Sequence, residues 1–347
     1  MPRMSLPSIL ITGGAGFLGS HMVKAFIDAG KSVRVLDIVE PPAWAKQVEY
    51  MQGRVDDVDA VARATHGVES VIHAAFASPR HSPHTLRTVN IDGTRLAYEA
   101  ARNGGARRFV LISSTIVEKP PRRHPCLPRS GLSRLDDYRA SRAEAEAWLL
   151  RQAGLSVAVV RPKTFFGPGK VGAFAMMFDA VRRADAVPVL GAGANHYQLL
   201  DIRDMAEGVR LLETTGNSGV FHFGAEHFGT VRQDLQALID HAGNGARLHF
   251  LPAPLAKTGL RCIELAGVTP LSEWHYCSAW GQDSVANIGR AQKELGWHPL
   301  RSNAQTLTEA YDAYTAALRE AGYVNTTHPI PASHKLLRGL FRLLSVR

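Results

Sequence analysis

The sequence predicts an α/β fold, and three observations support that prediction. Short apolar segments typical of buried strands alternate with longer helical segments through the first half of the chain. Such alternation requires right-handed crossovers, which place helices on both faces of a parallel sheet. A glycine-rich turn follows the first apolar segment, and the alternation becomes less regular past Arg161-Pro162. We therefore expect a Rossmann-type doubly wound sheet with a smaller C-terminal substrate lobe.

The elements follow from apolar periodicity and from residues that end helices. We expect strands at 8–11, 33–36, 48–51, 68–74, 109–112 and 157–160, with shorter strands near Val187 and Val220. We expect helices from Phe17 through Ile27, and at 58–65, 86–103, 136–151, 174–183, 203–212, 231–241 and 305–318. Gly104-Gly105 ends the long third helix, and Gly167-Pro168-Gly169 marks a turn after the last long strand.

Composition narrows the class of protein. The chain has 347 residues, of which 45% are hydrophobic and 20% charged, as in ordinary globular proteins of one large or two unequal domains. We find no secretory signal and no apolar stretch of about 18 residues. The three cysteines lack metal or redox spacing, which favours a reducing, cytoplasmic location. Because the cluster His222, Glu226, His227 also lacks metal spacing, no metal site is expected.

The formal net charge of +9 favours anionic partners. The arginines are scattered along the chain and form no basic stripe with interleaved aromatic residues. We therefore expect a small-molecule substrate and no nucleic-acid partner.

The segment Thr12-Gly13-Gly14-Ala15-Gly16-Phe17-Leu18-Gly19 joins the first strand to the first helix. Glycines in this context permit a tight turn and close approach of the backbone to a pyrophosphate, which the helix N-terminus attracts. The residues expected at the pyrophosphate are Gly13, Gly16, Phe17, Leu18 and Gly19. The alternative is an ordinary glycine-rich turn.

Asp37 ends the second strand, 18 residues after Gly19. A carboxylate there accepts hydrogen bonds from the adenosine ribose hydroxyls and repels a 2′-phosphate, so NAD is favoured over NADP. The alternative is that Asp37 caps the loop that follows its strand.

Three residues carry the predicted chemistry. Ser114 lies at the end of a central strand, whereas Tyr138 and Arg142 lie four residues apart and share one face of a helix. Beside a nicotinamide, a phenol takes the proton of a substrate alcohol, a serine hydroxyl orients the substrate oxygen, and a nearby cation favours phenolate. Taken singly, these residues also suit an ordinary strand end and a surface pair.

With these residues the chain resembles the extended short-chain dehydrogenase/reductase family, in its NAD-dependent epimerase/dehydratase branch, over about residues 8 to 320. The matching motifs are Thr12 to Gly19, His73-Ala74-Ala75, Asn90 with Gly93-Thr94, Ser113-Ser114, Tyr138 with Ala140-Ser141-Arg142, Arg161-Pro162 with Gly167-Pro168-Gly169, and Leu295-Gly296-Trp297-His298-Pro299. The resemblance implies a Rossmann domain, bound NAD and reversible oxidation of a hydroxyl, in many relatives on a nucleotide sugar. Relatives often dimerise through a helix pair that includes the catalytic tyrosine, so a homodimer is expected.

The resemblance assigns the catalytic positions to Ser114, Tyr138 and Arg142, the last standing where the family has lysine. Arginine keeps the charge and bonds ribose hydroxyls, but its planar head is not a lysine point charge. Further cofactor-binding residues are implied at Arg54, Val55, Ala74, Ala75, Asn90 and Arg161, and again at Tyr138 and Arg142. Arg54 replaces an aspartate that usually binds the adenine amino group. His73 is expected to be a buried strand-end residue rather than a proton carrier.

The implied domains are an NAD-binding Rossmann domain at 1–165, to which some later segments return, and a mainly substrate-binding lobe at 166–330. Thr164 replaces a common asparagine and Tyr197 replaces an arginine that clamps a diphosphate in many relatives. Both departures weaken the leading hypothesis of a nucleotide-sugar substrate. Gly191-Ala192-Gly193-Ala194-Asn195 also resembles 3β-hydroxysteroid dehydrogenases, which act on hydrophobic, membrane-associated alcohols or ketones. Because of Arg142, a catalytically weakened NAD-binding regulatory protein is a third hypothesis.

The C-terminal tail, 331–347, has apolar residues at 336, 337, 340, 341 and 344, with basic residues around them. This spacing predicts one apolar helical face. Two interpretations stay open: peripheral contact with an anionic membrane, or docking on this protein's own domain or on a second subunit.

Overall fold

The computed structural model describes residues 8–79, 81–118, 134–169, 174–252 and 282–321. A seven-stranded sheet forms its centre, in the order β10-β6-β5-β4-β1-β2-β3, and all neighbouring strands in it run parallel. Its strands are β1 (Ile9–Thr12), β2 (Val33–Asp37), β3 (Glu49–Gln52), β4 (Ser70–His73), β5 (Arg108–Ile112), β6 (Ser156–Pro162) and β10 (Gly219–Phe223). The predicted fold class is confirmed.

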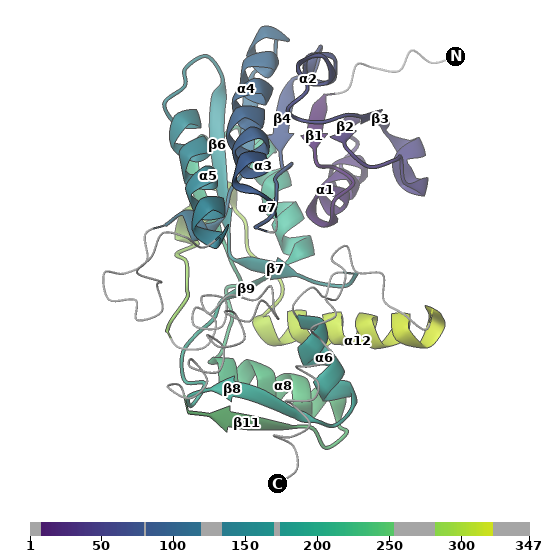
Figure 1. Cartoon of the computed structure of the whole chain (residues 1–347), viewed down its shortest axis with the longest axis vertical. Coiled ribbons are helices and arrows are strands. Elements are labelled where there is room, and N and C mark those ends of the chain that lie inside the picture. Colours follow the sequence, from purple (N-terminus) through teal and green to yellow (C-terminus); the bar gives the residue numbers. More distant parts are fainter. Residues whose placement is uncertain (1–7, 80, 119–133, 170–173, 253–281, 322–347) are drawn as a thin grey trace.

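Helices cover both faces of the sheet (Figure 1). One face carries α1 (Phe17–Asp28), α7 (Ile202–Thr215) and α11 (Gly289–Leu295), and the other carries α2 (Val58–Thr65), α4 (Gly93–Asn103) and α5 (Arg134–Leu149). Each face packs a separate apolar core, in which a fully buried side chain such as Phe26 or Phe109 contributes about 1.5–3 kcal/mol. From β1 the chain adds β2 and β3 on one side, and it then returns to add β4 on the other side of β1. Ligands of doubly wound sheets bind at the carboxyl ends of the strands, beside such a switch point.

The segment before α4 differs in detail from the single helix expected at 86–103. It begins at Ser82, whose side chain caps α3 (Pro83–Leu86), and continues through a π-helical segment, Arg87–Asp92, into α4. The short 3₁₀ helices are η1 (Ala43–Gln47) and η3 (Thr115–Val117).

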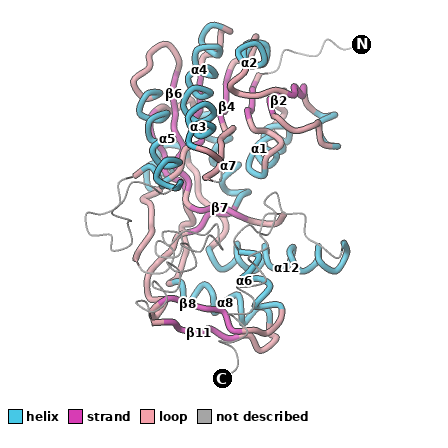
Figure 2. Tube along the Cα trace, in the orientation of Figure 1, coloured by secondary structure: helices cyan, strands magenta, loops and turns pink. Residues whose placement is uncertain are grey.

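The smaller lobe has its own apolar core. It contains α6 (Phe174–Arg182), β8 (Ala186–Leu190), α8 (Val231–Ala242), β11 (Arg247–Leu251) and α12 (Asn303–Ala321), with β11 parallel to β8. β6 leads directly into β7 (Thr164–Phe166), which pairs with β9 (Leu199–Asp201) at the junction, so the lobe lies beyond the carboxyl end of β6 (Figures 1 and 2). Three residues are too few to show an alternating pattern, which is why β7 and β9 were not predicted.

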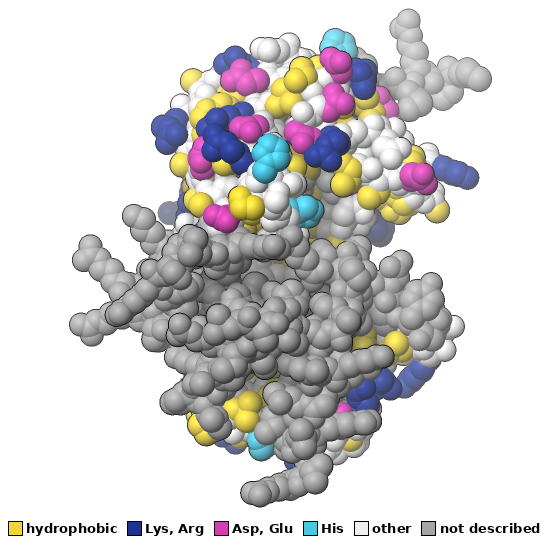
Figure 3. Space-filling view, in the orientation of Figure 1, with side chains coloured by type: hydrophobic (Ala, Val, Ile, Leu, Met, Phe, Trp, Pro, Cys, Tyr) yellow, Lys and Arg dark blue, Asp and Glu magenta, His cyan; other side chains and the backbone are white. Residues whose placement is uncertain are grey.

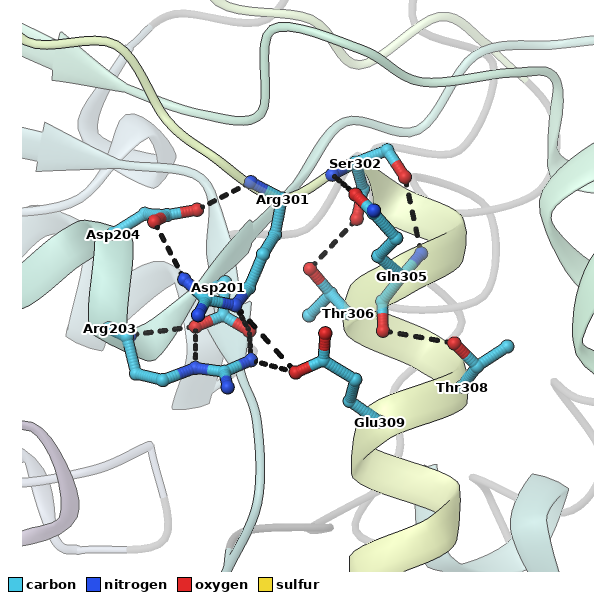
Figure 4. A network of polar contacts seen from close by, with 9 residues as sticks. All are labelled: Asp201, Arg203, Asp204, Arg301, Ser302, Gln305, Thr306, Thr308 and Glu309. Carbon is cyan, nitrogen blue, oxygen red and sulfur yellow. Dashed lines mark hydrogen bonds and ion pairs between the residues drawn. The ribbon is translucent and has the colours of Figure 1, made fainter.

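An ionic network around the buried Asp201 holds α12 against the start of α7 (Figure 4). Asp201 caps α7 and bonds Arg203, whose guanidinium also bonds Glu309 of α12 at 2.5 Å. Arg301 donates to Asp204 at 3.1 Å. Because Asp201 is fully buried, these partners offset the cost of burying its charge and fix the lobe at the edge of the sheet.

The tail, 331–347, lies outside the described residues. Among the described helices, none is both long and apolar enough to cross a membrane. On the face of the sheet lobe that Figure 3 shows, side chains of opposite charge are interspersed.

Candidate active site

The glycine turn has a shape that only glycines permit. Gly13 has a φ of 71°, in the left-handed region, and a Cβ there would lie 3.0 Å from the backbone of Ala75. A Cβ on Gly19 would lie 2.1 Å from the carbonyl oxygen of Gly13. Gly16 caps α1 without a side-chain hydrogen bond. The turn therefore brings bare backbone to the N-terminus of a helix, a cradle that fits the pyrophosphate of a dinucleotide.

Asp37 connects this turn to the end of β2. Its carboxylate accepts hydrogen bonds from the backbone N–H of Ala15 at 2.9 Å and of Val39 at 3.2 Å. The second bond is the loop cap that the alternative interpretation expected, and the first holds the carboxylate beside the glycine turn. Burial, with the charge of Asp37, raises the pKa of the Tyr50 phenol to about 12.

Arg54, Val55, Ala74 and Ala75, which are also predicted to bind the cofactor, have surroundings that differ from those of Asp37. Arg54 is paired with Asp56 through two bonds of 2.8 Å, and Val55 is buried. The amides of Ala74 and Ala75 donate to Thr12 Oγ1 at 3.2 and 3.3 Å. These bonds align the loop after β4 with the loop after β1.

His73 is completely buried beneath this loop. Its Nδ1 lies 2.9 Å from Thr12 Oγ1, and within the described part of the chain its Nε2 has no hydrogen-bond partner. Burial, assisted by the charge of Arg142, lowers the pKa of His73 to about 3. The imidazole is therefore neutral in the folded protein at neutral pH.

His73 should make the folded state sensitive to mild acid. In the unfolded chain the imidazole takes a proton below its ordinary pKa of about 6.5, whereas in the folded chain it does not until about pH 3. The contribution of His73 to stability is therefore complete above pH 6.5 and is lost as pH falls toward 3, at about 1.4 kcal/mol per pH unit.

Urea unfolding of the wild type and of His73→Asn tests this. From pH 6.5 to 5, the wild type should lose about 2 kcal/mol relative to the variant. Carboxyl groups common to both proteins cancel in the difference. A difference that does not change with pH would contradict the prediction.

The three predicted catalytic residues converge on the carboxyl end of β5. Arg142 is 6% exposed, and its Nη2 donates to the Ile112 carbonyl at 2.7 Å, two residues before Ser114. Its guanidinium carbon lies 5.4 Å from the centre of the half-buried Tyr138 ring. Ser114 Oγ caps η3 by accepting from the Ile116 N–H at 3.3 Å. α5 thus brings a cation to the end of β5, near the serine, and holds the Tyr138 ring close to that cation.

Phe76 is a neighbour of Arg142 that sequence reasoning missed. The guanidinium carbon lies 3.8 Å from the centre of the Phe76 ring, within cation–π range. A planar guanidinium stacks on such a face, which an ammonium does less well. This contact gives a physical reason for arginine at position 142. Proximity of Phe76 to the His73-Ala74-Ala75 motif was the one available signal.

Asn90 holds the part of α5 that carries Tyr138. Its side-chain oxygen accepts from the Ala77 N–H at 2.7 Å, and its amide donates to Ser141 Oγ at 3.0 Å. Ser141 Oγ in turn donates to the carbonyl of Tyr138 at 2.8 Å. Asn90 therefore acts on Tyr138 through Ser141.

Arg161 belongs to a charged cluster beside the serine pair. It bonds Glu146 at 2.9 Å and Glu118 at 3.1 Å, and Glu118 also lies 2.5 Å from His222 Nε2. Ser113 Oγ donates to Glu146, which is 3% exposed, at 2.6 Å. Sequence reasoning identified Arg161 but missed both glutamates, because only tertiary structure brings α5, η3 and β10 together. Within the described residues no cluster of three or more histidine, cysteine or acidic side chains could hold a metal ion.

Comparison with known proteins agrees with this geometry. Residues 9–223 match the model of the NAD dependent epimerase/dehydratase family. An uncharacterized protein, y4nG, of Sinorhizobium fredii is 31% identical, over 94% of this chain and 84% of its own length. A ceramide reductase of Caulobacter vibrioides is 33% identical over 57% of this chain and 58% of its own length. A dTDP-glucose 4,6-dehydratase of Streptomyces antibioticus is 28% identical, over 88% and 92% respectively.

Among solved structures, a UDP-glucose 4-epimerase of Thermotoga maritima has the same fold, with a TM-score of 0.69 at 22% identity, over 89% of this chain and 99% of that one. The family match extends from β1 to the end of β10, and it includes both the glycine cradle and the Tyr138–Arg142 pair. The protein is therefore a member of the NAD-dependent epimerase/dehydratase family, an enzyme of the extended short-chain dehydrogenase/reductase type whose cofactor is NAD.

Proposed function

We propose that this enzyme oxidises, and in the reverse direction reduces, a hydroxyl-bearing carbon of a nucleotide sugar, with Tyr138 as the acid/base. The observation that carries the proposal is the placement of Arg142. It bonds the Ile112 carbonyl and lies near the Tyr138 ring, so that phenol, cation and Ser114 share one edge of the sheet.

Each side chain has a definite task in this proposal. Bound NAD supplies the acceptor for the hydride, through its nicotinamide ring. Tyr138 as phenolate takes the proton of the substrate hydroxyl while the C–H hydrogen leaves that carbon with its electron pair, so an alcohol becomes a ketone. Arg142 stabilises the negative charge of the phenolate before the transfer.

Ser114 is suited to orient the substrate oxygen. Its Oγ accepts a hydrogen bond from the Ile116 N–H, and among the described residues none accepts a hydrogen bond from its hydroxyl. That hydrogen is available for the substrate oxygen. Gly13, Gly16 and Gly19 would hold the cofactor pyrophosphate, and Asp37 the adenosine ribose.

A second candidate is oxidation or reduction of a hydrophobic alcohol or ketone. The ceramide reductase of Caulobacter vibrioides favours it through its 33% identity, and so does Tyr197 at the position of the expected diphosphate arginine. The dTDP-glucose 4,6-dehydratase, which is matched over most of both chains, favours the nucleotide sugar. A homodimer through α5 and a membrane contact of residues 331–347 stay predictions.

Turnover assays separate these candidates. The NAD-loaded protein is incubated with UDP-glucose, dTDP-glucose, a 3β-hydroxysteroid and a ceramide in separate reactions. The reduced nicotinamide is followed by absorbance and the products are identified. We expect transient or net reduction of bound NAD with a nucleotide sugar. Turnover of the steroid or ceramide alone would replace the leading proposal with the second candidate, and turnover of none would contradict both.

A further inference from the structure

Lys163 is a buried cation that the proposed chemistry does not use. It joins β6 to β7, and its backbone N–H donates to the Phe223 carbonyl at 2.8 Å, so it sits at the carboxyl edge of the sheet. The preceding carbonyl, of Pro162, accepts a bond from Thr115, the residue after Ser114, at 3.3 Å. Lys163 therefore lies on the side of the sheet where the substrate oxygen is expected.

The ammonium of Lys163 has unused hydrogen-bonding capacity. Only 7% of the residue is exposed, and within the described chain its Nζ makes one hydrogen bond, to Ser284 Oγ at 2.6 Å. An ammonium carries three N–H donors. The nearby carboxylate, that of Glu118, is already bonded to Arg161 and His222. Burial accordingly lowers the pKa of Lys163 to about 8.

The surroundings of this cation are rich in hydroxyl groups. Nζ lies 5.6 Å from the centre of the Tyr197 ring, and the Tyr197 hydroxyl lies 2.7 Å from Thr164 Oγ1. Ser284 is held in place by backbone bonds to His196 and Gln198. A buried charge is costly unless it is paired and hydrogen-bonded. The N–H donors of the ammonium that have no partner here can form charge-assisted hydrogen bonds to the oxygens of an anion.

We propose that Lys163, with the Ser284 hydroxyl, binds a phosphoryl group of the substrate and selects phosphorylated over uncharged alcohols. This inference rests on the proposed function and adds to it a source of substrate selectivity. The cation that binds the phosphoryl group is then Lys163. At position 197, where many relatives have an arginine that clamps a diphosphate, this chain has a tyrosine. The phosphoryl group could belong to a nucleoside diphosphate or to a phosphorylated lipid, and the experiment distinguishes the two.

Calorimetric titration of the NAD-saturated protein tests the inference without any turnover. The probes are UDP and uridine, and octyl phosphate and octanol. We expect at least one phosphorylated probe to bind far more tightly than its uncharged counterpart. Lys163→Met should weaken that binding roughly tenfold to hundredfold, since hydrogen bonds to charged groups are the stronger ones, and should leave the uncharged probe unaffected. Lys163→Arg should restore most of the affinity.

Control variants separate a loss of phosphate binding from a loss of folded structure. Lys293→Met removes an exposed lysine of α11 and should leave all four affinities unchanged. If Lys163→Met does not fold, Lys163→Gln takes its place. Tighter binding of UDP would indicate that the phosphoryl group belongs to a nucleoside diphosphate. Tighter binding of octyl phosphate would indicate that it belongs to a phosphorylated lipid. Equal affinity of wild type and Lys163 variants for both phosphorylated probes would overturn the inference. Loss of phosphate affinity in a protein that turns over no tested alcohol would uphold it while contradicting the proposed function.

Discussion

Replacing Tyr138 with phenylalanine is expected to lower kcat by about 10²- to 10⁴-fold, the usual contribution of a positioned acid/base. The phenol lies on α5 beside Arg142, and Arg142 is tied to the end of β5 by its 2.7 Å bond to Ile112. Phenylalanine keeps the ring and its packing but cannot accept the substrate proton. The affinity for NAD, measured by titration, should change little.

A matched control is Tyr98→Phe. Tyr98 is fully buried and donates a hydrogen bond to the Ala153 carbonyl at 2.8 Å, on the α4 side of the sheet. Its loss should reduce the free energy of unfolding by about 1 kcal/mol and leave kcat unchanged. Undiminished turnover by Tyr138→Phe would remove Tyr138 from its proposed role.

Replacing Gly19 with alanine is expected to weaken NAD binding by about a hundredfold or more, which corresponds to about 3 kcal/mol. The added Cβ would lie 2.1 Å from the Gly13 oxygen and 2.6 Å from the Gly14 Cα. These are backbone atoms of the cradle, so they cannot rotate away as a side chain does, and the whole turn has to shift. Titration with NAD and thermal unfolding measure the two consequences.

Gly243→Ala is the control for the general cost of replacing glycine. Gly243 ends α8 with a φ of 59°, and the nearest atom to an added Cβ is a carbonyl oxygen at 3.9 Å. Alanine there should lower stability by about 1 kcal/mol through its left-handed backbone, with no effect on NAD affinity. A Gly19→Ala variant that binds NAD like the wild type would show that the cradle does not hold the pyrophosphate.

The sequence was most informative where the chemistry depends on neighbours along the chain. The glycine turn lies within eight residues of a strand and a helix start, and steric exclusion of a Cβ is a local property of that turn. Tyr138 and Arg142 share a helix face because of their spacing alone. The most buried strands of the central sheet, β1, β2, β4 and β5, were predictable for the same reason, since each is a short run dominated by apolar residues.

Partners from distant segments could not be predicted. Phe76 and Arg142 are far apart in sequence, as are Ser113 and Glu146, and no spacing rule links them. Lys163 looked like one more scattered basic residue until the fold buried it against Ser284, 121 positions later. Arg161 was expected at the cofactor, yet the structure surrounds its guanidinium with Glu146 and Glu118.

By itself the sequence determined the type of fold, the dinucleotide cradle and the residue types available for hydride chemistry, since these depend on short-range sterics and periodicity. Only the tertiary structure decided which charges are paired and which stay available. Pairing matters most for buried charges. Arg161 is bonded to carboxylates, whereas Lys163 lies in a buried site where, among the described residues, it makes one hydrogen bond. The difference arises from contacts between separate segments: the partners of Arg161 lie 15 and 43 positions away in the sequence, and Ser284 lies 121 positions from Lys163.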